Sequence, residues 1–186
     1  LNQIQKKIEF IINQEFNELR DYLPIKADKI LDIGSGIGLI DIFLNQYYNS
    51  GTDFTLIDKN FISKNIKYGY HKNYESYNYL DISKNFLENN GVEEDKIHLI
   101  DADNKFDLQG NFDLIISLIS MGYHYPIYNY LNKIKKISNT ETIFIFDIAS
   151  EHHSIDELKK LFLEVNIIKI YEKKHPQIRV CCKKII

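Results

Sequence analysis

The fold is decided by a nine-residue stretch, Ile30-Leu31-Asp32-Ile33-Gly34-Ser35-Gly36-Ile37-Gly38. A short apolar run leads into three glycines at alternate positions, and apolar residues at helical spacing resume at Leu39. Glycine permits a sharp turn, and it lets a ligand approach the backbone where a Cβ would otherwise stand. The stretch therefore predicts a strand, a glycine turn and a helix, which together form the first unit of an α/β sheet.

The rest of the chain repeats this alternation. Strands are predicted at 29–33, 54–57, 97–100, 112–118, 142–148, 166–171 and 177–183, and helices at 1–22, from 39, 74–90, 127–137 and 154–163. The short turn at 173–176 is too tight for a parallel crossover, so the last two strands should form an antiparallel hairpin. We expect one domain, 1–186, with the helix 1–22 packed on its core. Its fold class is α/β: a doubly wound, Rossmann-like, seven-stranded sheet, mostly parallel, with helices on both faces and the ligand crevice at the carboxyl ends of the strands.

Composition excludes several classes of function. The net charge of -3 leaves no basic footprint for a nucleic acid, so no nucleic-acid partner is expected. No apolar run approaches the about 18 residues of a membrane span, and the start of the chain has no signal-peptide pattern. Cys181 and Cys182 are adjacent, a spacing that rarely suits a disulfide. We therefore expect a cytoplasmic protein. Because the only methionine is Met121, we also expect that further residues precede Leu1 in the full-length protein.

The glycine pattern separates two classes of nucleotide-binding turn. A dinucleotide fingerprint, G-x-G-x-x-G, would need its third glycine at Leu39, whereas this turn is G-x-G-x-G. The acidic residue before that pattern, at the end of the first strand, resembles the first motif of the class I S-adenosylmethionine-dependent methyltransferases. The resemblance covers nearly the whole chain, including the terminal hairpin. It implies methyl transfer with S-adenosylmethionine as cofactor and S-adenosylhomocysteine as product.

Two further acidic strand ends support the resemblance. Asp58 ends the second strand, where a carboxylate can accept hydrogen bonds from both ribose hydroxyls of an adenosine, although it could also be a capping aspartate. The resemblance implies that Asp101 and Ala102 read the adenine amino group, with Asp103 as the alternative, and that Asp32 holds the methionyl ammonium. The full cofactor-binding set is Asp32, Gly34, Ser35, Gly36, Gly38, Asp58, Asp101, Ala102 and Ser117.

The acceptor should lie beyond the fourth predicted strand. The segment 117–126 has no Asn/Asp-Pro-Pro-aromatic motif of the kind that nucleic-acid N-methyltransferases carry there. It has instead His124, a candidate general base, between Tyr123 and Tyr125, which could contact a small substrate. Tyr68 and His71 lie in a polar segment that could close over the acceptor. That segment resembles short sugar O-methyltransferases of bacterial surface-polysaccharide gene clusters, which implies a hydroxylated sugar or capsule precursor.

Other readings stay open at this point. N-methylation of a small metabolite is the nearest variant, and a nicotinamide-dependent oxidoreductase or a catalytically silent partner subunit are the others. We expect no metal, because His152 and His153 have no evident carboxylate or thiol partner. Cys181 and Cys182 should alternate faces of the last strand, one toward the core and one outward. The oligomeric state is left open.

Overall fold

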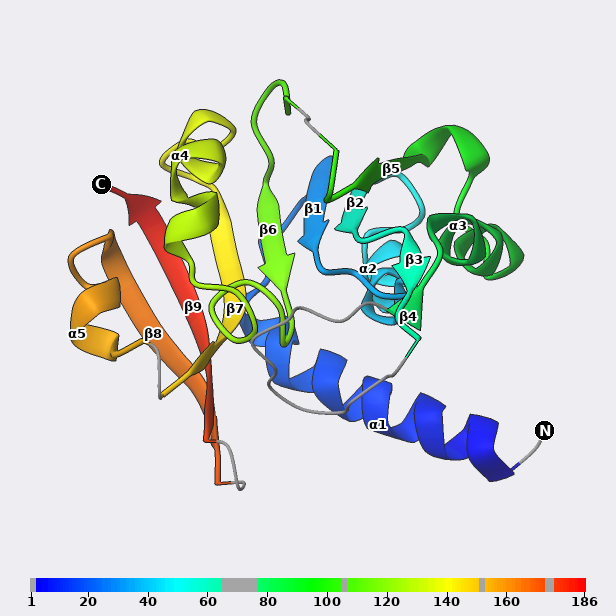
Figure 1. The fold of residues 1–186 in the computed structure, drawn as a ribbon, viewed down its shortest axis with the longest axis horizontal. Helices are drawn as coiled ribbons and strands as arrows, with labels where there is room; N and C mark the ends of the chain where they lie inside the picture. The colour runs from blue at the N-terminus through cyan, green and yellow to red at the C-terminus, as the bar shows by residue number, and fades with distance from the viewer. Residues whose placement is uncertain (1–2, 65–76, 105–106, 151–152, 173–175) are drawn as a thin grey trace.

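The computed structural model describes residues 3–64, 77–104, 107–150, 153–172 and 176–186. Its main sheet has seven strands in the order β5-β2-β1-β6-β7-β9-β8 (Figure 1). The neighbouring pairs from β5 to β7 are parallel, and β9 runs antiparallel to both β7 and β8. The doubly wound sheet and its antiparallel C-terminal hairpin are therefore confirmed.

The elements follow the predicted alternation of strand and helix. The strands of the main sheet are β1 (Lys29–Ile33), β2 (Asp53–Asp58), β5 (Ile97–Asp101), β6 (Leu114–Ser117), β7 (Ile143–Ala149), β8 (Phe162–Tyr171) and β9 (Gln177–Ile185). The helices are α1 (Gln3–Leu19), α2 (Leu39–Tyr47), α3 (Leu80–Asn89), α4 (Tyr128–Lys136) and α5 (Ile155–Leu158), with short 3-10 turns at Arg20–Tyr22 and Glu94–Lys96. A separate two-stranded ribbon pairs β3 (Phe61–Ile62) with β4 (Tyr77–Asn78).

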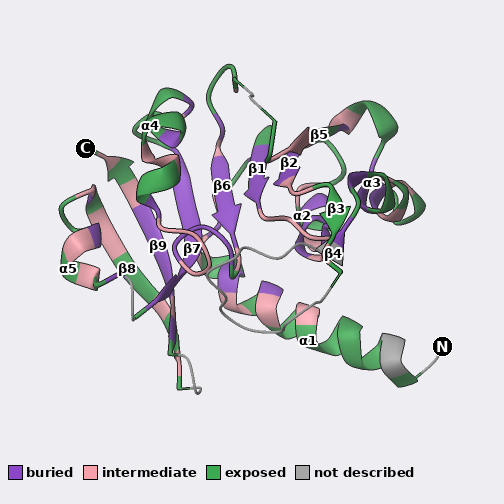
Figure 2. Cartoon of the chain, viewed as in Figure 1, coloured by how far each residue is buried: buried purple, intermediate pink, exposed green. Residues whose placement is uncertain are grey.

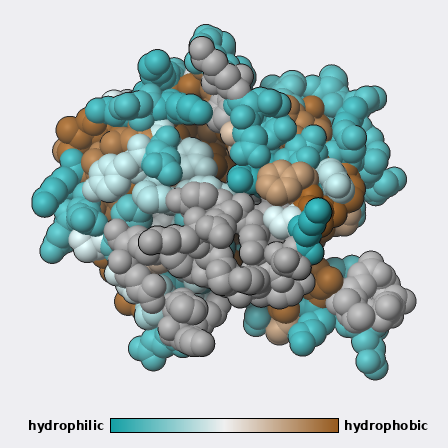
Figure 3. All heavy atoms as spheres, viewed as in Figure 1, coloured by the Kyte–Doolittle hydropathy of each residue, from teal (hydrophilic) through white to brown (hydrophobic). Residues whose placement is uncertain are grey.

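Two apolar layers cover the two faces of the sheet. One contains Phe16 and Leu19 of α1, Leu44 of α2 and Leu87 of α3; the other contains Ile134 of α4. Figure 2 shows the central strands buried between these layers, whereas the N-terminal part of α1 is exposed. On the face seen in Figure 3, hydrophilic residues predominate among the described ones. No helix among the described residues is both long and apolar enough to cross a membrane.

The structure corrects four local predictions. The helix predicted at 74–90 begins only at Leu80, because residues 77–78 pair with 61–62. The helix predicted at 154–163 is the single turn α5, and β8 already begins at Phe162, whose partner is Ile185. The strand predicted at 112–118 is shortened to β6. Neither cysteine of β9 points outward: Cys181 and Cys182 are buried in opposite layers, because helices or loops cover both faces there.

A buried ion pair connects α1 to the sheet. Arg179 of β9 donates from Nε to Asp147 Oδ1 over 2.8 Å and from a terminal nitrogen to Asp147 Oδ2 over 3.0 Å. The same guanidinium donates to Glu15 of α1 over 2.7 Å and lies 3.7 Å from Glu18. Asp147 and Glu15 raise the pKa of Arg179, although burial lowers it. The guanidinium is therefore kept charged inside the protein, and it fixes the C-terminal half of α1.

Candidate functional site

The glycine turn lies at the point where the strand order reverses, between β1 and β6. Gly34 has φ +76°, and a Cβ there would lie 2.1 Å from Ser120 Oγ, so no larger residue fits. Gly36 has φ +56°, and a Cβ there would meet nothing within 4 Å. Residues other than glycine rarely adopt such positive φ values. The open space over Gly36 leaves its backbone accessible to a ligand. The turn therefore has the shape that the sequence predicted.

Two residues that the sequence analysis missed bind the backbone of this turn at the Gly36 carbonyl. Asn78 Nδ2 and Ser83 Oγ both donate to the carbonyl of Gly36, over 2.7 and 2.8 Å, and Asn78 also donates to Ser83 over 2.9 Å. Both side chains are buried. Asn78 comes from β4 and Ser83 from α3, and no motif in the sequence marks either of them. Only the packing of α3 and the β3–β4 ribbon against the turn reveals their role.

Asp58 stands at the end of β2, next to the glycine turn. Its Oδ2 accepts a hydrogen bond from the Gly36 N–H over 2.6 Å, and its Oδ1 accepts from the Lys59 N–H over 2.7 Å. Burial raises the pKa of Asp58, while these two hydrogen bonds and the Lys59 charge oppose that rise. Each carboxylate oxygen has a second lone pair left to accept a hydroxyl proton. The carboxylate is therefore oriented and still able to accept from a ligand.

Three residues at the end of β5, Asp101, Ala102 and Asp103, are the candidates for contacting the adenine, and they occupy different positions. Asp101 accepts from the Asp103 N–H over 3.0 Å and from Asn104 Nδ2 over 3.3 Å, so its carboxylate caps its own turn. Ala102 is held beside β2 by a hydrogen bond from its N–H to the Asp58 carbonyl, over 2.8 Å. The Asp103 carboxylate lies 3.6 Å from Lys59 Nζ. Asp103 and Ala102 line the cavity described next, and Asp101 is not part of its lining.

A cavity of about 270 Å³ lies over these strand ends. Its walls come from four segments that are far apart in sequence. The lining residues include Gly34, Asp58, Ala102, Asp103, Ser120, Tyr125 and, from α4, Tyr130. The Tyr125 and Tyr130 rings stand at 90° to one another with centroids 6.4 Å apart. Pockets for small ligands usually measure about 300–1,000 Å³, so this cavity suits one part of a nucleotide-like ligand.

Below the glycine turn, Asp32 of β1 meets Asp41 of α2. Asp32 is 4% exposed and Asp41 is 0% exposed. The two carboxyls lie close enough for each to shift the pKa of the other, and neither oxygen of Asp41 has a hydrogen-bond partner among the described residues. Burial raises the pKa of both groups, that of Asp41 to about 7, and the charges of Asp41 and Asp58 raise the pKa of Asp32 further. Sequence reasoning identified Asp32 but gave no role to Asp41.

The loop after β6 is held by hydrogen bonds to its backbone. Ser117 Oγ donates to the Ile33 carbonyl over 2.6 Å and accepts from the Met121 N–H over 2.8 Å, so this side chain ties β6 to β1. Ile119 has φ +63°, a conformation that is strained for a β-branched residue. Its N–H donates to Asp147 Oδ2 over 3.1 Å. The ion pair between Asp147 and Arg179 therefore also supports this strained residue.

His124 and its two neighbouring tyrosines occupy the same loop. The backbone N–H groups of His124 and Tyr125 both donate to the Ser120 carbonyl, over 2.9 and 3.0 Å. The Tyr123 and His124 rings are nearly perpendicular, with centroids 5.0 Å apart. Burial lowers the pKa of His124, which favours a neutral imidazole near pH 7. Of these three residues only Tyr125 lines the 270 Å³ cavity; His124 and Tyr123 stand beside it in the chain.

Some candidates fall elsewhere. Tyr68, His71 and His152 lie outside the described residues. His153 is buried, and its Nε2 accepts from the Ile127 N–H over 3.3 Å. Burial raises the pKa of both cysteine thiols, that of Cys181 to about 11, which makes them poor nucleophiles. In the part of the chain that the structure describes, no group of three His, Cys, Asp or Glu residues comes together in a way that could hold a metal ion.

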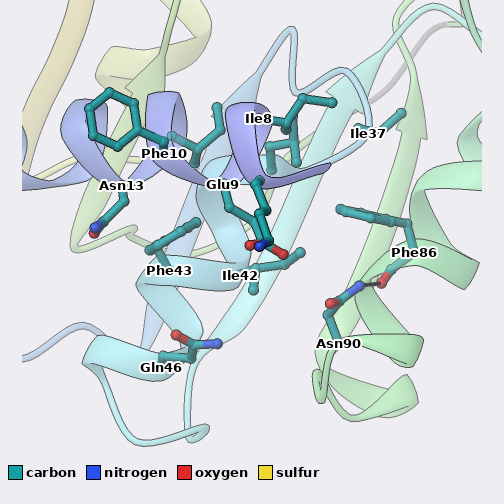
Figure 4. Close-up of a pocket in the computed structure, with 13 residues that line it drawn as sticks. Ile8, Glu9, Phe10, Asn13, Ile37, Ile42, Phe43, Gln46, Phe86 and Asn90 are labelled. Carbon is teal, nitrogen blue, oxygen red and sulfur yellow. Dashed lines mark hydrogen bonds between the residues drawn. The ribbon is translucent and has the colours of Figure 1, made fainter. Parts of the chain in front are cut away.

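A larger hollow of about 980 Å³ lies between α1, α2 and α3 (Figure 4). Its lining is mainly apolar, with Phe10 from α1, Phe43 from α2 and Phe86 from α3, and Ile37 of the glycine turn borders it. Asp58 and the end of β5 are not part of this lining. The polar groups of the candidate site therefore gather at the smaller cavity.

No family model and no curated protein match the sequence. Solved structures do match in fold. A provisionally assigned O-methyltransferase from Nostoc punctiforme superposes with a TM-score of 0.64 at 15% identity over 94% of this chain and 56% of its own. A 16S rRNA N2 G1207 methyltransferase from T. thermophilus, solved with AdoMet and guanosine, gives 0.62 at 12% over 94% and 42%. A ribosomal protein L11 methylase from Lactobacillus delbrueckii subsp. bulgaricus gives 0.58 at 16% over 99% and 80%.

The chain thus spans little more than half the length of the Nostoc protein. At these identities the similarity concerns the fold, while the methylated molecules named for the other two proteins differ from each other. The strand order and the antiparallel terminal hairpin agree with that similarity. The chain therefore has the fold of the class I S-adenosylmethionine-dependent methyltransferases.

Proposed function

We propose that this chain binds S-adenosylmethionine and transfers its methyl group to a small acceptor. The observation that carries the proposal is the convergence of Gly34, the Asp58 carboxylate and the Ala102–Asp103 turn around one cavity at the switch point of the sheet, where the N–H of the open Gly36 orients that carboxylate. In sheets of this kind ligands bind beyond the carboxyl ends of the strands, at that point. The fold similarity supports the same function.

The residues present suit this cofactor. Asp58 would accept from the two ribose hydroxyls, and Asp103 or the backbone of Ala102 would meet the adenine amino group. Asp32 would face the ammonium group, and carboxylates in the neighbourhood lower the cost of holding a cation. Gly34, Ser35, Gly36 and Gly38 would leave room beside the backbone, and Ser117 would fix the β6 end by its bonds to β1 and Met121.

The chemistry asks little of the protein beyond alignment. The bound cofactor would supply a methyl group already activated by a sulfonium, so the protein's contribution is to orient the acceptor in line and exclude water. An acceptor hydroxyl additionally needs a base to remove its proton as the new bond forms. His124 is the candidate base, since the lowered pKa of its imidazole leaves it neutral and able to take a proton near pH 7.

Calorimetric titration with S-adenosylhomocysteine and, separately, with NAD tests the proposal. We expect binding of the first and none of the second. Asp58→Ala should weaken S-adenosylhomocysteine binding at least about tenfold, because each charge-assisted hydrogen bond to a ribose hydroxyl contributes roughly 1.5–3 kcal/mol. Asp53→Ala, at the other end of β2, is the matched control and should leave the affinity unchanged. Unchanged affinity in Asp58→Ala would show that β2 does not read the ribose.

We further propose that the acceptor is a hydroxyl group, such as that of a sugar or capsule precursor. Two features support this: a histidine beside two tyrosines in the loop after β6, and a cavity wall that includes Tyr125. Tyrosine offers both an aromatic face and a hydroxyl to a sugar. Tyr123, Tyr68 and His71 are the further candidate contacts. Methylation at nitrogen is the alternative outcome, for which no base would be required.

His124→Gln separates these outcomes once an acceptor is found by screening hydroxylated sugars and amines. With a hydroxyl acceptor, we expect cofactor affinity to be retained and the transfer rate to fall by about two orders of magnitude, the usual contribution of a general base. The rate of the unsubstituted chain should rise with pH through one ionisation at or below about 6.5, since burial lowers the pKa of His124. Turnover within about threefold of the unsubstituted chain would place the base elsewhere.

A further inference from the structure

The buried pair of Asp32 and Asp41 requires a proton. Asp32 belongs to β1 and Asp41 to α2; both side chains are buried, and neither carboxyl oxygen of Asp41 has a hydrogen-bond partner among the described residues. Two ionised carboxylates repel and cannot donate to one another, so at least one of this buried pair must carry a proton. Two negative charges without donors or cations would be very unfavourable at this depth.

No lysine or arginine of the part of the chain that the structure describes forms an ion pair with Asp32 or Asp41. Asp58, from the end of β2, is the other charged group that acts on Asp32, and it is itself an acid. Lys59 is directed to Asp103, at 3.6 Å. On the side of α3 the neighbouring residue is Leu87, which would lie 3.0 Å from a Cβ on Gly38, and Asp41 Oδ2 would lie 3.3 Å from the same position. On the side of α1 the layer is formed by Phe16 and Leu19.

The pair also lies beside the proposed cofactor site. Asp41 is in the first turn of α2, directly after the glycine turn, and Asp32 lies in β1, two residues before Gly34. An ammonium group arriving beside Asp32 would be a donor of three hydrogen bonds and a full positive charge. Its arrival would remove the reason for the pair to keep its proton, because the cation stabilises the ionised carboxylates.

We propose that Asp32 and Asp41 share a proton in the ligand-free chain and release it to solvent when the ammonium group of the cofactor binds beside Asp32. The inference rests on the proposed function. One O–H bond of the pair breaks, the proton goes to the buffer, and the carboxylate pair accepts from the ammonium instead. Asp32 is thus the contact, whereas Asp41 is a positioning residue that sets how many protons accompany binding. Cofactor affinity must then increase with pH until the pair ionises by itself.

The direct test is calorimetric titration with S-adenosylhomocysteine at about pH 6.5, in phosphate and in imidazole buffer. The ammonium of this ligand stays protonated at that pH, so a heat that depends on the ionisation enthalpy of the buffer counts protons released by the protein. We expect about one proton per bound ligand. Asp41→Asn, which keeps the shape and offers Asp32 an N–H donor, should still bind but release less than about half as much. Asp81→Asn, an exposed position in the first turn of α3, should behave as the unsubstituted chain.

A second measurement needs no variant. The dissociation constant of the unsubstituted chain should fall as pH rises from about 5.5 to 7.5, by up to about tenfold per pH unit for one released proton. Binding that is independent of both buffer and pH, or proton release that persists in Asp41→Asn, would overturn the inference while leaving the proposed function intact. An absence of S-adenosylhomocysteine binding would overturn both.

Discussion

Two aspartates of the sheet, Asp32 on β1 and Asp147 on β7, are both buried, but their charges are compensated differently. Asp147 receives two hydrogen bonds from Arg179 and a third from the Ile119 N–H. Among the described residues Asp32 has no ion-pair partner, and the side chain that acts on it most strongly is a second acid, Asp41. The charge of Asp147 is compensated by a cation of the protein itself. A cation beside Asp32 would stabilise its ionised carboxylate.

Under the proposed function, the difference separates a structural acid, Asp147, from an acid that takes part in binding, Asp32. A buried charge with a full set of partners contributes to one defined arrangement, here the position of α1 and of the strained residue Ile119. A buried acid without a cation costs stability and persists where a ligand can use it. The location agrees with this distinction, because Asp32 lies next to the glycine turn, whereas Arg179 and Asp147 join β9, β7 and α1.

The largest effect should come from breaking the compensated pair. Arg179→Met should lower the free energy of unfolding by about 3–5 kcal/mol, because it leaves Asp147 buried without its cation. Urea unfolding at pH 7 measures this. The double substitution Arg179→Met with Asp147→Leu should recover most of the loss, since apolar residues of similar volume often replace a buried ion pair at little cost. If the single variant were as stable as the unsubstituted chain, Asp147 could not be a structural acid in the sense used here.

Substitution in the pair of Asp32 and Asp41 should have a smaller effect of opposite sign, an increase in the free energy of unfolding. The folded-state pKa values of the pair lie above the unfolded value of 3.8, that of Asp41 at about 7, so the folded chain binds more protons between these limits. The free energy of unfolding contributed by the pair should therefore decrease as pH rises from about 4 to about 7. Asp41→Asn should remove that decrease and gain about 1.4 kcal/mol or more at pH 7, the equivalent of one pKa unit.

Denaturant midpoints across this pH range, compared between the unsubstituted chain and Asp41→Asn without ligand, provide the measurement. Asp28→Asn, at an exposed position, is the control for a general loss of one negative charge. A parallel pH dependence in all three chains would mean that the acid pair carries no proton linkage. With S-adenosylhomocysteine present, the denaturant midpoints of the unsubstituted chain and of Asp41→Asn should become similar near neutral pH. The reason is that the ligand replaces the proton as the partner of Asp32.

The sequence determined those parts of the fold that depend on local pattern. Periodicity and turn chemistry gave the order of strands and helices, and the spacing of Gly34, Gly36 and Gly38 gave a turn with three positive φ values. Asp58 could be found in the same way, because a strand followed by an acid at a parallel-sheet edge is a local signal. Its hydrogen bond to the Gly36 N–H follows from the adjacency of β1 and β2.

Only the tertiary structure decided how side chains from distant segments compensate one another. Asn78 and Ser83 hold the Gly36 carbonyl although they lie more than forty residues away in sequence, at separations of 42 and 47. The β3–β4 ribbon and the early start of β8 depend on their pairing partners, which a local window does not contain. Arg179 could have been read as a surface arginine and Asp41 as a solvated helix residue. Burial decides otherwise, because the same carboxylate is a charge when it meets a guanidinium and a proton carrier when it meets a second acid.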